Sequence, residues 1–190
     1  MQLQGRFVDL RPLRPDDAEL TYRWRTSARA RLLNDGASTV AQQEAWIRNR
    51  PASELNFIIC RKDAVAVGML SLVGIDKVNR HAETGRFLIG DEDGVRGLPA
   101  AVEAMKLLYG IAFDTLGLVR IYGTIASENR RMIKWQRYLG MREEGRMRRH
   151  YFIDGSFQDA MMLGLLVEEY RAEALPRMNA LIGMATGAQA

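Results

Sequence analysis

The stretch AETGRFLIGDEDGVRGLPAAVEAMKLLYGIA, residues 82–112, predicts a buried strand, an acidic turn and a small-residue loop that begins a long amphipathic helix. The first N–H groups of a helix lack internal partners, and the helix dipole adds partial positive charge at that end. Arg96 stands just before the predicted helix and adds a full charge. The stretch therefore predicts an anion site that suits a phosphate-bearing cofactor.

The length of 190 residues and the composition of the whole chain, with 47% hydrophobic and 26% charged residues, fit one globular domain. We expect a domain over residues 1–171 and a C-terminal tail over residues 172–190. No apolar run approaches the roughly 18–20 residues that span a bilayer, and we expect no membrane partner. The net charge of +4 suits an anionic ligand, but no helix carries the dense basic face that nucleic acid requires.

Cysteine and histidine are too few for metal or disulfide chemistry. The single cysteine, Cys60, excludes an internal disulfide and predicts a reducing, cytoplasmic location. With only His81 and His150 beside it, we expect no metal site. The motifs GxSxG, GxxxxGK[ST] and HExxH are absent from the sequence, which removes several hydrolase and phosphotransferase classes.

Periodicity and turn residues predict the element order β, α, α, β, β, β, α, β, α, β, β. Strands are expected at residues 6–13, 56–61, 65–75, 82–90, 119–125, 146–153 and 158–166, and helices after Pro15 and at 40–49, 98–115 and 129–138. This order predicts one α/β domain on a mixed sheet. The strand–helix–strand unit across residues 82–125 should be parallel and right-handed.

Four segments in this order resemble the GNAT acetyltransferases. They are LRPLRPDDAELTYRWR, VGMLSLVGIDKVNRHAETGRFLIGDED, RGLPAA, and ASENRRMIKWQRYLGMREEGRMRRHYFIDGSFQDAMMLGLL, and the match as a whole covers roughly residues 6–168. The chain is similar to the branch of ribosomal-protein N-terminal and amino-sugar-nucleotide acetyltransferases. The resemblance implies a GNAT-type acyl-CoA N-acyltransferase fold, with a mixed central sheet, splayed fourth and fifth strands and flanking helices.

The resemblance also implies acetyl-CoA as co-substrate, without a metal. Cofactor-binding positions carried over from the family are Phe87, Leu88 and Ile89 for pantetheine, Arg96, Gly97, Leu98, Ala100 and Ala101 for pyrophosphate, and Asn129 and Arg131. Asn129 is also a good N-cap, and Arg131 also fits a solvated helix face. Pro99 departs from the family's glycine, and proline has no N–H to donate to a phosphate.

For catalysis, the resemblance points to Glu83 in the fourth strand as the base, acting through water. The alternative is a glutamate hydrogen-bonded to a neighbouring strand for structural reasons. Gln136 stands where the family usually has a tyrosine that acts as general acid, and glutamine has no labile proton. Either the thiolate leaves without that acid, another residue supplies the proton, or activity is weak or altered.

The acceptor site is expected between the first two helices and the final hairpin, with Tyr22, Arg23 and Trp24 as substrate-binding candidates. The alternative for Trp24 is a core residue. The leading hypothesis is transfer of acetyl from acetyl-CoA to a primary amine of a small molecule or nucleotide sugar. The alternatives are a protein N-terminal acetyltransferase acting on a peptide and a non-catalytic acetyl-CoA-binding module. A homodimer is common in the family.

Overall fold

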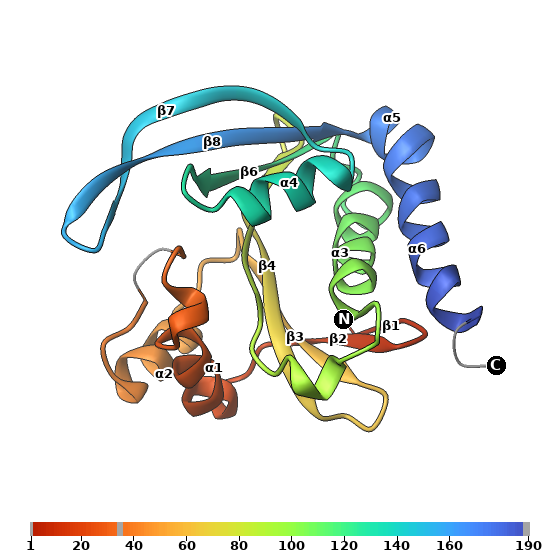
Figure 1. Cartoon of the computed structure of the whole chain (residues 1–190). Helices are drawn as coiled ribbons and strands as arrows, with labels where there is room; N and C mark the ends of the chain where they lie inside the picture. Colours follow the sequence, from red (N-terminus) through yellow and green to blue (C-terminus); the bar gives the residue numbers. More distant parts are fainter. Residues whose placement is uncertain (1, 34–35, 188–190) are drawn as a thin grey trace.

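The computed structural model describes residues 2–33 and 36–187 and is built around one mixed sheet. The eight strands follow the order β1-β2-β3-β4-β5-β6-β8-β7, in which β5 and β6 run parallel and the other neighbours antiparallel (Figure 1). The bounds are β1 Leu3–Gln4, β2 Val8–Pro12, β3 Leu55–Arg61, β4 Ala66–Asp76, β5 His81–Ile89, β6 Arg120–Ala126, β7 Arg142–Ile153 and β8 Ser156–Leu166. The predicted parallel unit and mixed sheet are confirmed.

Helices lie on both faces of the sheet, with α1 and α2 on one side and α3 and α6 on the other (Figure 1). The helices are α1 Ala18–Arg25, α2 Val40–Arg48, α3 Ala100–Gly110, α4 Arg130–Tyr138, α5 Val167–Glu169 and α6 Leu175–Gly187. Short helical turns lie at η1 Pro15–Asp17, η2 Ala28–Ala30, η3 Asp93–Val95, η4 Ile111–Thr115 and η5 Tyr170–Ala174.

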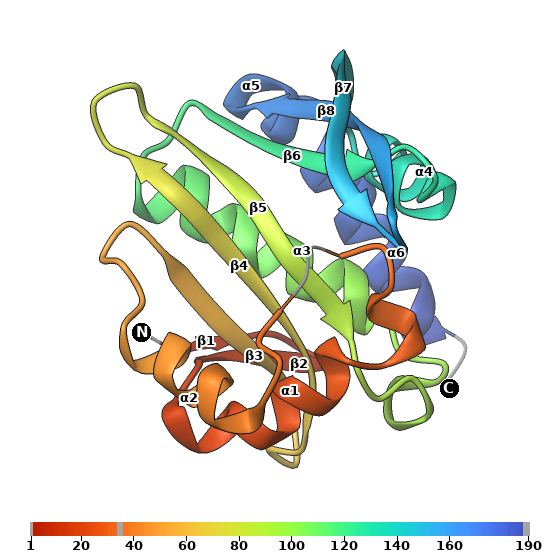
Figure 2. The ribbon, with the colours of Figure 1, turned by 90° about the vertical axis from the view of Figure 1, so that its left-hand side faces the viewer.

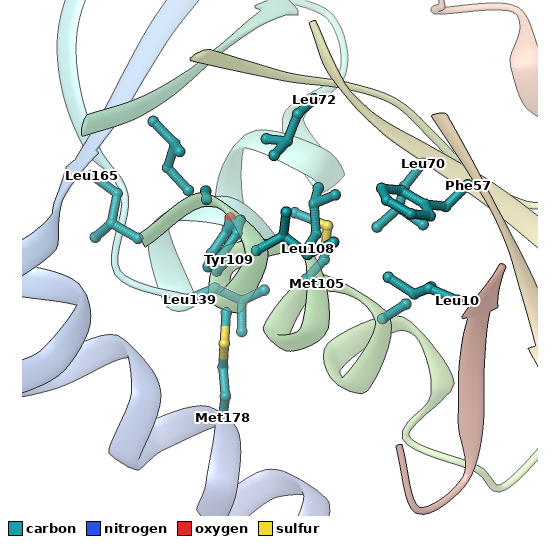
Figure 3. Close-up of a cluster of buried hydrophobic side chains, with 14 of the residues drawn as sticks. Leu10, Phe57, Leu70, Leu72, Met105, Leu108, Tyr109, Leu139, Leu165 and Met178 are labelled. Carbon is teal, nitrogen blue, oxygen red and sulfur yellow. The ribbon is translucent and has the colours of Figure 1, made fainter. Parts of the chain in front are cut away.

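Alternate side chains of one strand supply the two hydrophobic cores, one on each face of the sheet. In β3, Phe57 and Ile59 join the core under α3, whereas Ile58 and Cys60 join the core under α1 and α2. Successive side chains of a strand point to opposite faces, so a continuous apolar run marks a strand covered on both sides. Figure 3 shows the first of these cores, where Phe57 and side chains of α3 meet across the sheet face.

Local capping follows the sequence closely at α2. The Thr39 hydroxyl accepts a hydrogen bond from the Gln42 amide at 3.1 Å, as in one half of a capping box. The Gln42 side chain, however, accepts from the Ser38 amide at 2.9 Å rather than from Thr39. Thr39 therefore caps α2, but the Gln42 side chain binds the amide one residue before the N-cap.

The C-terminal segment, which the sequence predicts as a tail that forms a loose helix or frays, is helical up to Gly187. From Val167 to Gly187, α5, η5 and α6 follow one another, and Tyr170, Ala174 and Met178 are buried in the core beside α3. This helix begins before residue 172, where the predicted tail begins, and residues 188–190 lie outside the described residues. The division at residue 171 stays a prediction.

Candidate functional site

The parallel strands β5 and β6 separate after three paired residues. His81, Ala82 and Glu83 pair with Arg120, Ile121 and Tyr122, and the strands then diverge, as Figure 2 shows. The predicted splay of the fourth and fifth expected strands, which are β5 and β6, is thereby confirmed. Beyond these three pairs, β5 and β6 face each other across the gap with backbone N–H and C=O groups that are not paired between the two strands.

Two cavities meet at this gap. The first cavity has a volume of about 470 Å³ and the second about 560 Å³. The residues that line both come from the α1–α2 connection, β5 and α4: Leu32, Leu33, Phe87, Asn129 and Met132. Because the cavities share these walls, two molecules bound in them would lie next to each other at the gap.

The second cavity reaches the beginning of α3. Pro99 is the N-cap residue of α3. The first amides of the helix therefore have no helical carbonyl four residues earlier to accept their hydrogen bonds. Leu98 and Ala101 line the cavity. Gly97 has φ +79°, a conformation that L-residues rarely adopt, and a Cβ there would meet no atom within 4 Å. Amides at the beginning of a helix are suited to bind an anion, and phosphate binding at this loop stays a prediction.

Of the five residues of the predicted pyrophosphate loop, Arg96, Gly97 and Ala100 are not among those that line the second cavity. The Arg96 side chain is exposed and forms an ion pair with Asp93. Ala100 is buried in the core beneath the loop. Contact of Arg96, Gly97, Leu98, Ala100 and Ala101 with pyrophosphate stays a prediction.

The predicted pantetheine residues follow the edge of the gap. Leu88 and Ile89 line the second cavity, and Phe87 lines both cavities. The Phe87 ring stacks on Trp135 of α4, with centroids 5.2 Å apart and planes 15° apart. This stack joins β5 to α4 across the gap, a contact that sequence spacing did not reveal.

Helix α4 presents Asn129 and Arg131 at the same place. Asn129 is the N-cap, and its Oδ1 accepts from the Met132 amide at 3.2 Å. Its structural role as a cap is therefore present, and it lines both cavities as well. Arg131 is exposed and lines the second cavity. Contact of either residue with a cofactor stays a prediction.

Glu83 lines the first cavity and is held by β6. Its Oε1 accepts from the Thr124 hydroxyl at 2.5 Å and from the Thr124 amide at 3.2 Å. The Thr124 and Tyr151 hydroxyls lie 2.8 Å apart, and Tyr151 also donates to the Thr124 carbonyl at 3.1 Å. A carboxylate, a threonine and a phenol thus form a connected path of hydrogen bonds along the cavity wall.

The environment of Tyr151 favours its protonated form. Burial raises the pKa of the Tyr151 phenol, the hydrogen bond with Thr124 opposes this, and the charge of Glu83 raises it further. Tyr151 comes from β7, far along the chain from Glu83. Sequence reasoning missed it, because only the pairing of β7 with β8 and of β8 with β6 brings it to this cavity.

The Gln136 side chain is buried and hydrogen-bonded to a core tyrosine. It is buried, and its Oε1 accepts from the Tyr109 hydroxyl at 3.0 Å, although it also lines the first cavity. Tyr138, the tyrosine nearest in sequence, is 52% exposed and lines neither cavity. Tyr151 is the tyrosine that lines the first cavity.

The three predicted acceptor residues on α1 line neither cavity. Tyr22 donates its hydroxyl to the Ser38 carbonyl at 3.1 Å, and Arg23 is exposed. Trp24 is buried in the core cluster under α1 and α2, and a Cβ at Gly90 would lie 2.3 Å from its ring atoms. This is the arrangement that the core alternative for Trp24 expects, and substrate contact by Tyr22, Arg23 and Trp24 stays a prediction.

Residues 2–33 and 36–187 show neither a metal-binding cluster nor a membrane-spanning helix. No group of three or more His, Cys, Asp or Glu side chains in this part is arranged to hold a metal ion. Among its helices, none combines the length and apolar character needed to cross a membrane.

Comparison with known proteins gives a consistent family. A model described as an acetyltransferase (GNAT) domain matches residues 8–142. Spermidine N(1)-acetyltransferase of Escherichia coli K12 is 32% identical over 121 residues, which are 64% of this chain and 63% of the relative. YdaF of Bacillus subtilis, named as a candidate ribosomal N-acetyltransferase, is 32% identical over 58% of this chain and 59% of its own. The chain thus spans less than two thirds of these relatives' length.

Solved structures extend the likeness over nearly the whole chain. A GCN5-related N-acetyltransferase from Brucella melitensis superposes with a TM-score of 0.80 at 25% identity, covering 95% of this chain and 85% of that one. A mutant spermidine N-acetyltransferase SpeG from Vibrio cholerae gives 0.76 at 21% identity, covering 88% and 98%. The second likeness is one of fold.

Proposed function

Because this chain belongs to the GNAT acetyltransferase family, we propose that it transfers an acetyl group from acetyl-CoA to a primary amine by direct attack in a ternary complex. The acceptor is a small molecule or a nucleotide sugar. The observation that carries the proposal is the placement of Glu83 in the first cavity, beside the gap between β5 and β6 where the second cavity meets it. Such an arrangement holds donor and acceptor side by side.

The second cavity holds the CoA moiety in this proposal. Acetyl-CoA, when bound, supplies the activated acetyl group as a thioester. The amides at the beginning of α3 and the open glycine conformation at Gly97 face its phosphates. Phe87, Leu88 and Ile89 lie along its pantetheine arm, and Arg131 stands near enough to the second cavity to add positive charge.

Glu83 acts as the base. An amine must lose a proton before it can attack, and Glu83 removes that proton, directly or through a water molecule. The two hydrogen bonds from Thr124 hold the Glu83 carboxyl group in a fixed orientation. A backbone N–H near Leu88 or Ile89 stabilises the charge that develops on the carbonyl oxygen during attack.

Tyr151 supplies the proton that Gln136 has no means to give. Its phenol donates to the departing CoA thiolate and is reprotonated through Thr124 from Glu83, along the hydrogen bonds that connect them. Two protons leave the ammonium nitrogen in the whole reaction: one ends on the CoA sulfur, and the other enters solvent. The C–S bond breaks as the amide C–N bond is completed.

A thiol-release assay with acetyl-CoA tests the proposal across amino sugars, nucleotide amino sugars, polyamines and peptides. We expect release with at least one small amine and a product heavier by one acetyl group. Polyamines belong in the panel because of the spermidine acetyltransferase relative. Ribosomal-protein N-terminal peptides belong there because YdaF, a relative of similar identity, carries the ribosomal name.

The same assay separates the alternatives. Release with peptides alone assigns the protein N-terminal activity. No release with any acceptor, together with tight CoA binding by calorimetry, assigns a non-catalytic acetyl-CoA-binding module, for which Pro99 and Gln136 are the relevant departures from the family pattern.

A further inference from the structure

Arg86 has a backbone conformation that side chains rarely adopt. Its φ is +55°, in the left-handed region that glycine favours. The register between β4 and β5 shifts here, since Ser71 pairs with Gly85 but Met69 pairs with Leu88. Two residues of β5, Arg86 and Phe87, therefore stand opposite one residue of β4, as in a β-bulge.

The bulge re-aims the Arg86 side chain. In a regular strand, residues three apart point to opposite faces, so Glu83 and Arg86 would face away from each other. Both nevertheless line the first cavity. Strained backbone of this kind persists where surrounding contacts over-determine it, and it is concentrated at functional sites.

Those surrounding contacts fix the guanidinium group of Arg86. Nη1 donates to Glu54 Oε2 at 2.9 Å and to Asn56 Oδ1 at 3.1 Å, and Nη2 donates to Glu54 Oε1 at 3.2 Å. The group lies 4.9 Å from the ring centroid of Trp46, which also lines the first cavity. Asn56 is held in turn by the Ser71 hydroxyl at 2.6 Å.

These bonds leave part of the guanidinium available. Arginine carries five N–H donors, and the contacts with Glu54 and Asn56 use three of them. The Arg86 side chain is 28% exposed. An immobilised, partly exposed arginine fork in a cavity wall is suited to bind a carboxylate or phosphate.

From this geometry we infer that Arg86 binds an anionic group of the acceptor, so that the substrate is a primary amine that also carries a carboxylate or a phosphate. The inference rests on the proposed acetyl transfer and narrows its acceptor class. Glu83 binds the end that carries the amine, and Arg86 binds the other end. The two residues are three positions apart on β5, which is on the order of 10 Å along the backbone of a strand.

The charges of the cavity point the same way. Among its described lining residues, Arg25 and Arg86 are cationic and Glu83 is the one carboxylate. A polyamine would place a second positive charge beside Arg86, whose own charge is already paired with Glu54, and no carboxylate other than Glu83 stands among these lining residues to pair with it. The spermidine acetyltransferase name therefore describes the relative, and Arg86 selects against that substrate class here.

A matched series of five-carbon amines tests the inference. The acceptors are 5-aminopentanoate, pentylamine and 1,5-diaminopentane, with 3-aminopropyl phosphate to distinguish phosphate from carboxylate as the anion. We expect kcat/KM for the better anionic amine to exceed that for the diamine at least tenfold. In Arg86→Gln that preference should fall at least tenfold, because the charged fork is lost.

Arg80→Gln is the control. Arg80 also has a positive φ, +56°, but its guanidinium donates to the Gly117 carbonyl and lines neither cavity. The Arg80→Gln variant should prefer the anionic amine over the diamine as strongly as the unmodified protein does. If Arg86→Gln does not fold because the Glu54 carboxylate loses its partner, the double variant Glu54→Gln/Arg86→Gln removes both charges and tests the same loss.

Calorimetric binding of the same amines in the presence of CoA provides a readout independent of turnover. A protein that binds 5-aminopentanoate better than 1,5-diaminopentane, and loses this preference in the Arg86 variant, supports the inference even if no acetyl group is transferred; that outcome overturns the proposed function alone. A diamine preference in the unmodified protein, or an anion preference unchanged by Arg86→Gln, overturns the inference.

Discussion

Glu83 and Thr124 are joined by two hydrogen bonds across the place where β5 and β6 begin to separate. Thr124 donates both its hydroxyl, at 2.5 Å, and its amide, at 3.2 Å, to the same oxygen of Glu83. The parallel pairing ends at Glu83 and Tyr122, so this contact closes the paired end of the gap. A base candidate is thereby fixed beside the space that the two cavities share.

Substituting Glu83 with glutamine tests the base directly. Glu83→Gln keeps the size of the side chain but removes the group that accepts a proton, and we expect kcat to fall at least tenfold. CoA affinity by calorimetry should be unchanged, since Glu83 lines the first cavity and not the second. Equal rates for the two proteins would assign Glu83 a structural role.

Removing the Tyr151 hydroxyl tests the proton donor. Tyr151→Phe deletes the phenol 2.8 Å from the Thr124 hydroxyl, and we expect kcat to fall by about tenfold or more. Because burial raises the pKa of Tyr151, the phenol stays protonated at neutral and mildly alkaline pH. The rate of the unmodified protein should therefore show no loss from Tyr151 ionisation in the range where an ordinary tyrosine begins to ionise, and any loss at still higher pH that comes from this phenol should be absent from Tyr151→Phe.

Thr124→Ser and Thr124→Val provide the matched controls for that path. Serine keeps the hydroxyl that connects Glu83 and Tyr151, whereas valine keeps the shape without it. We expect the serine variant to retain most of its activity and the valine variant to lose about as much as Tyr151→Phe. Similar rates for serine and valine would contradict proton passage through Thr124.

Replacing Pro99 with glycine should affect CoA binding and stability in opposite directions. Pro99 caps α3 and has no N–H, so Pro99→Gly adds a donor at the beginning of the helix. We expect CoA to bind about fivefold more tightly by calorimetry. The free energy of unfolding should fall by about 0.5–1 kcal/mol, because glycine increases the entropy of the unfolded chain. An unchanged affinity would indicate that no donor is needed at this position.

The strands and helices could be predicted because their signals are local. Thr39 caps α2, Asn129 caps α4, and the apolar run of β3 matches a strand covered on both faces. Family resemblance then gave Glu83 its place on β5 next to the gap, and the parallel pairing with β6 is present.

The remaining parts of the site depend on contacts that spacing does not encode. Tyr151 reaches Thr124 only through the β6–β8–β7 pairing, and Arg86 lines the first cavity only because a bulge interrupts the two-residue alternation. Trp24 is a third example, because a tryptophan on an amphipathic helix looks the same in sequence whether it packs against Gly90 or a substrate. A bulge and a non-adjacent strand order leave no periodic signal.

The N-terminal strands are tied to α3 by Glu103, which makes this residue a stability prediction. Glu103 is 5% exposed and accepts from the amides of Arg6, Phe7 and Val8 at 2.7, 2.7 and 2.8 Å. Glu103→Ala leaves these donors without their acceptor, and we expect a loss of about 3 kcal/mol in urea unfolding. Exposed Glu168→Ala is the control, with an effect within about 0.5 kcal/mol. A loss within about 0.5 kcal/mol for Glu103→Ala would contradict the inference that Glu103 stabilises the contact between the N-terminal strands and α3.

Tyr170 should make the protein unfold more easily in alkali. It is 2% exposed and stacks on Phe113 at 4.8 Å, and burial, with a further effect from Asp114, raises its pKa from 10.0 to about 12. The unfolded chain therefore releases this proton at lower pH than the folded protein does. Since folding then holds the proton, the free energy of unfolding should fall as pH rises from about 10 towards 12. In Tyr170→Phe, which keeps the ring but has no ionisable group, urea unfolding between pH 8 and 11.5 should show a smaller fall. Parallel curves for the two proteins would mean that Tyr170 ionises equally in both states.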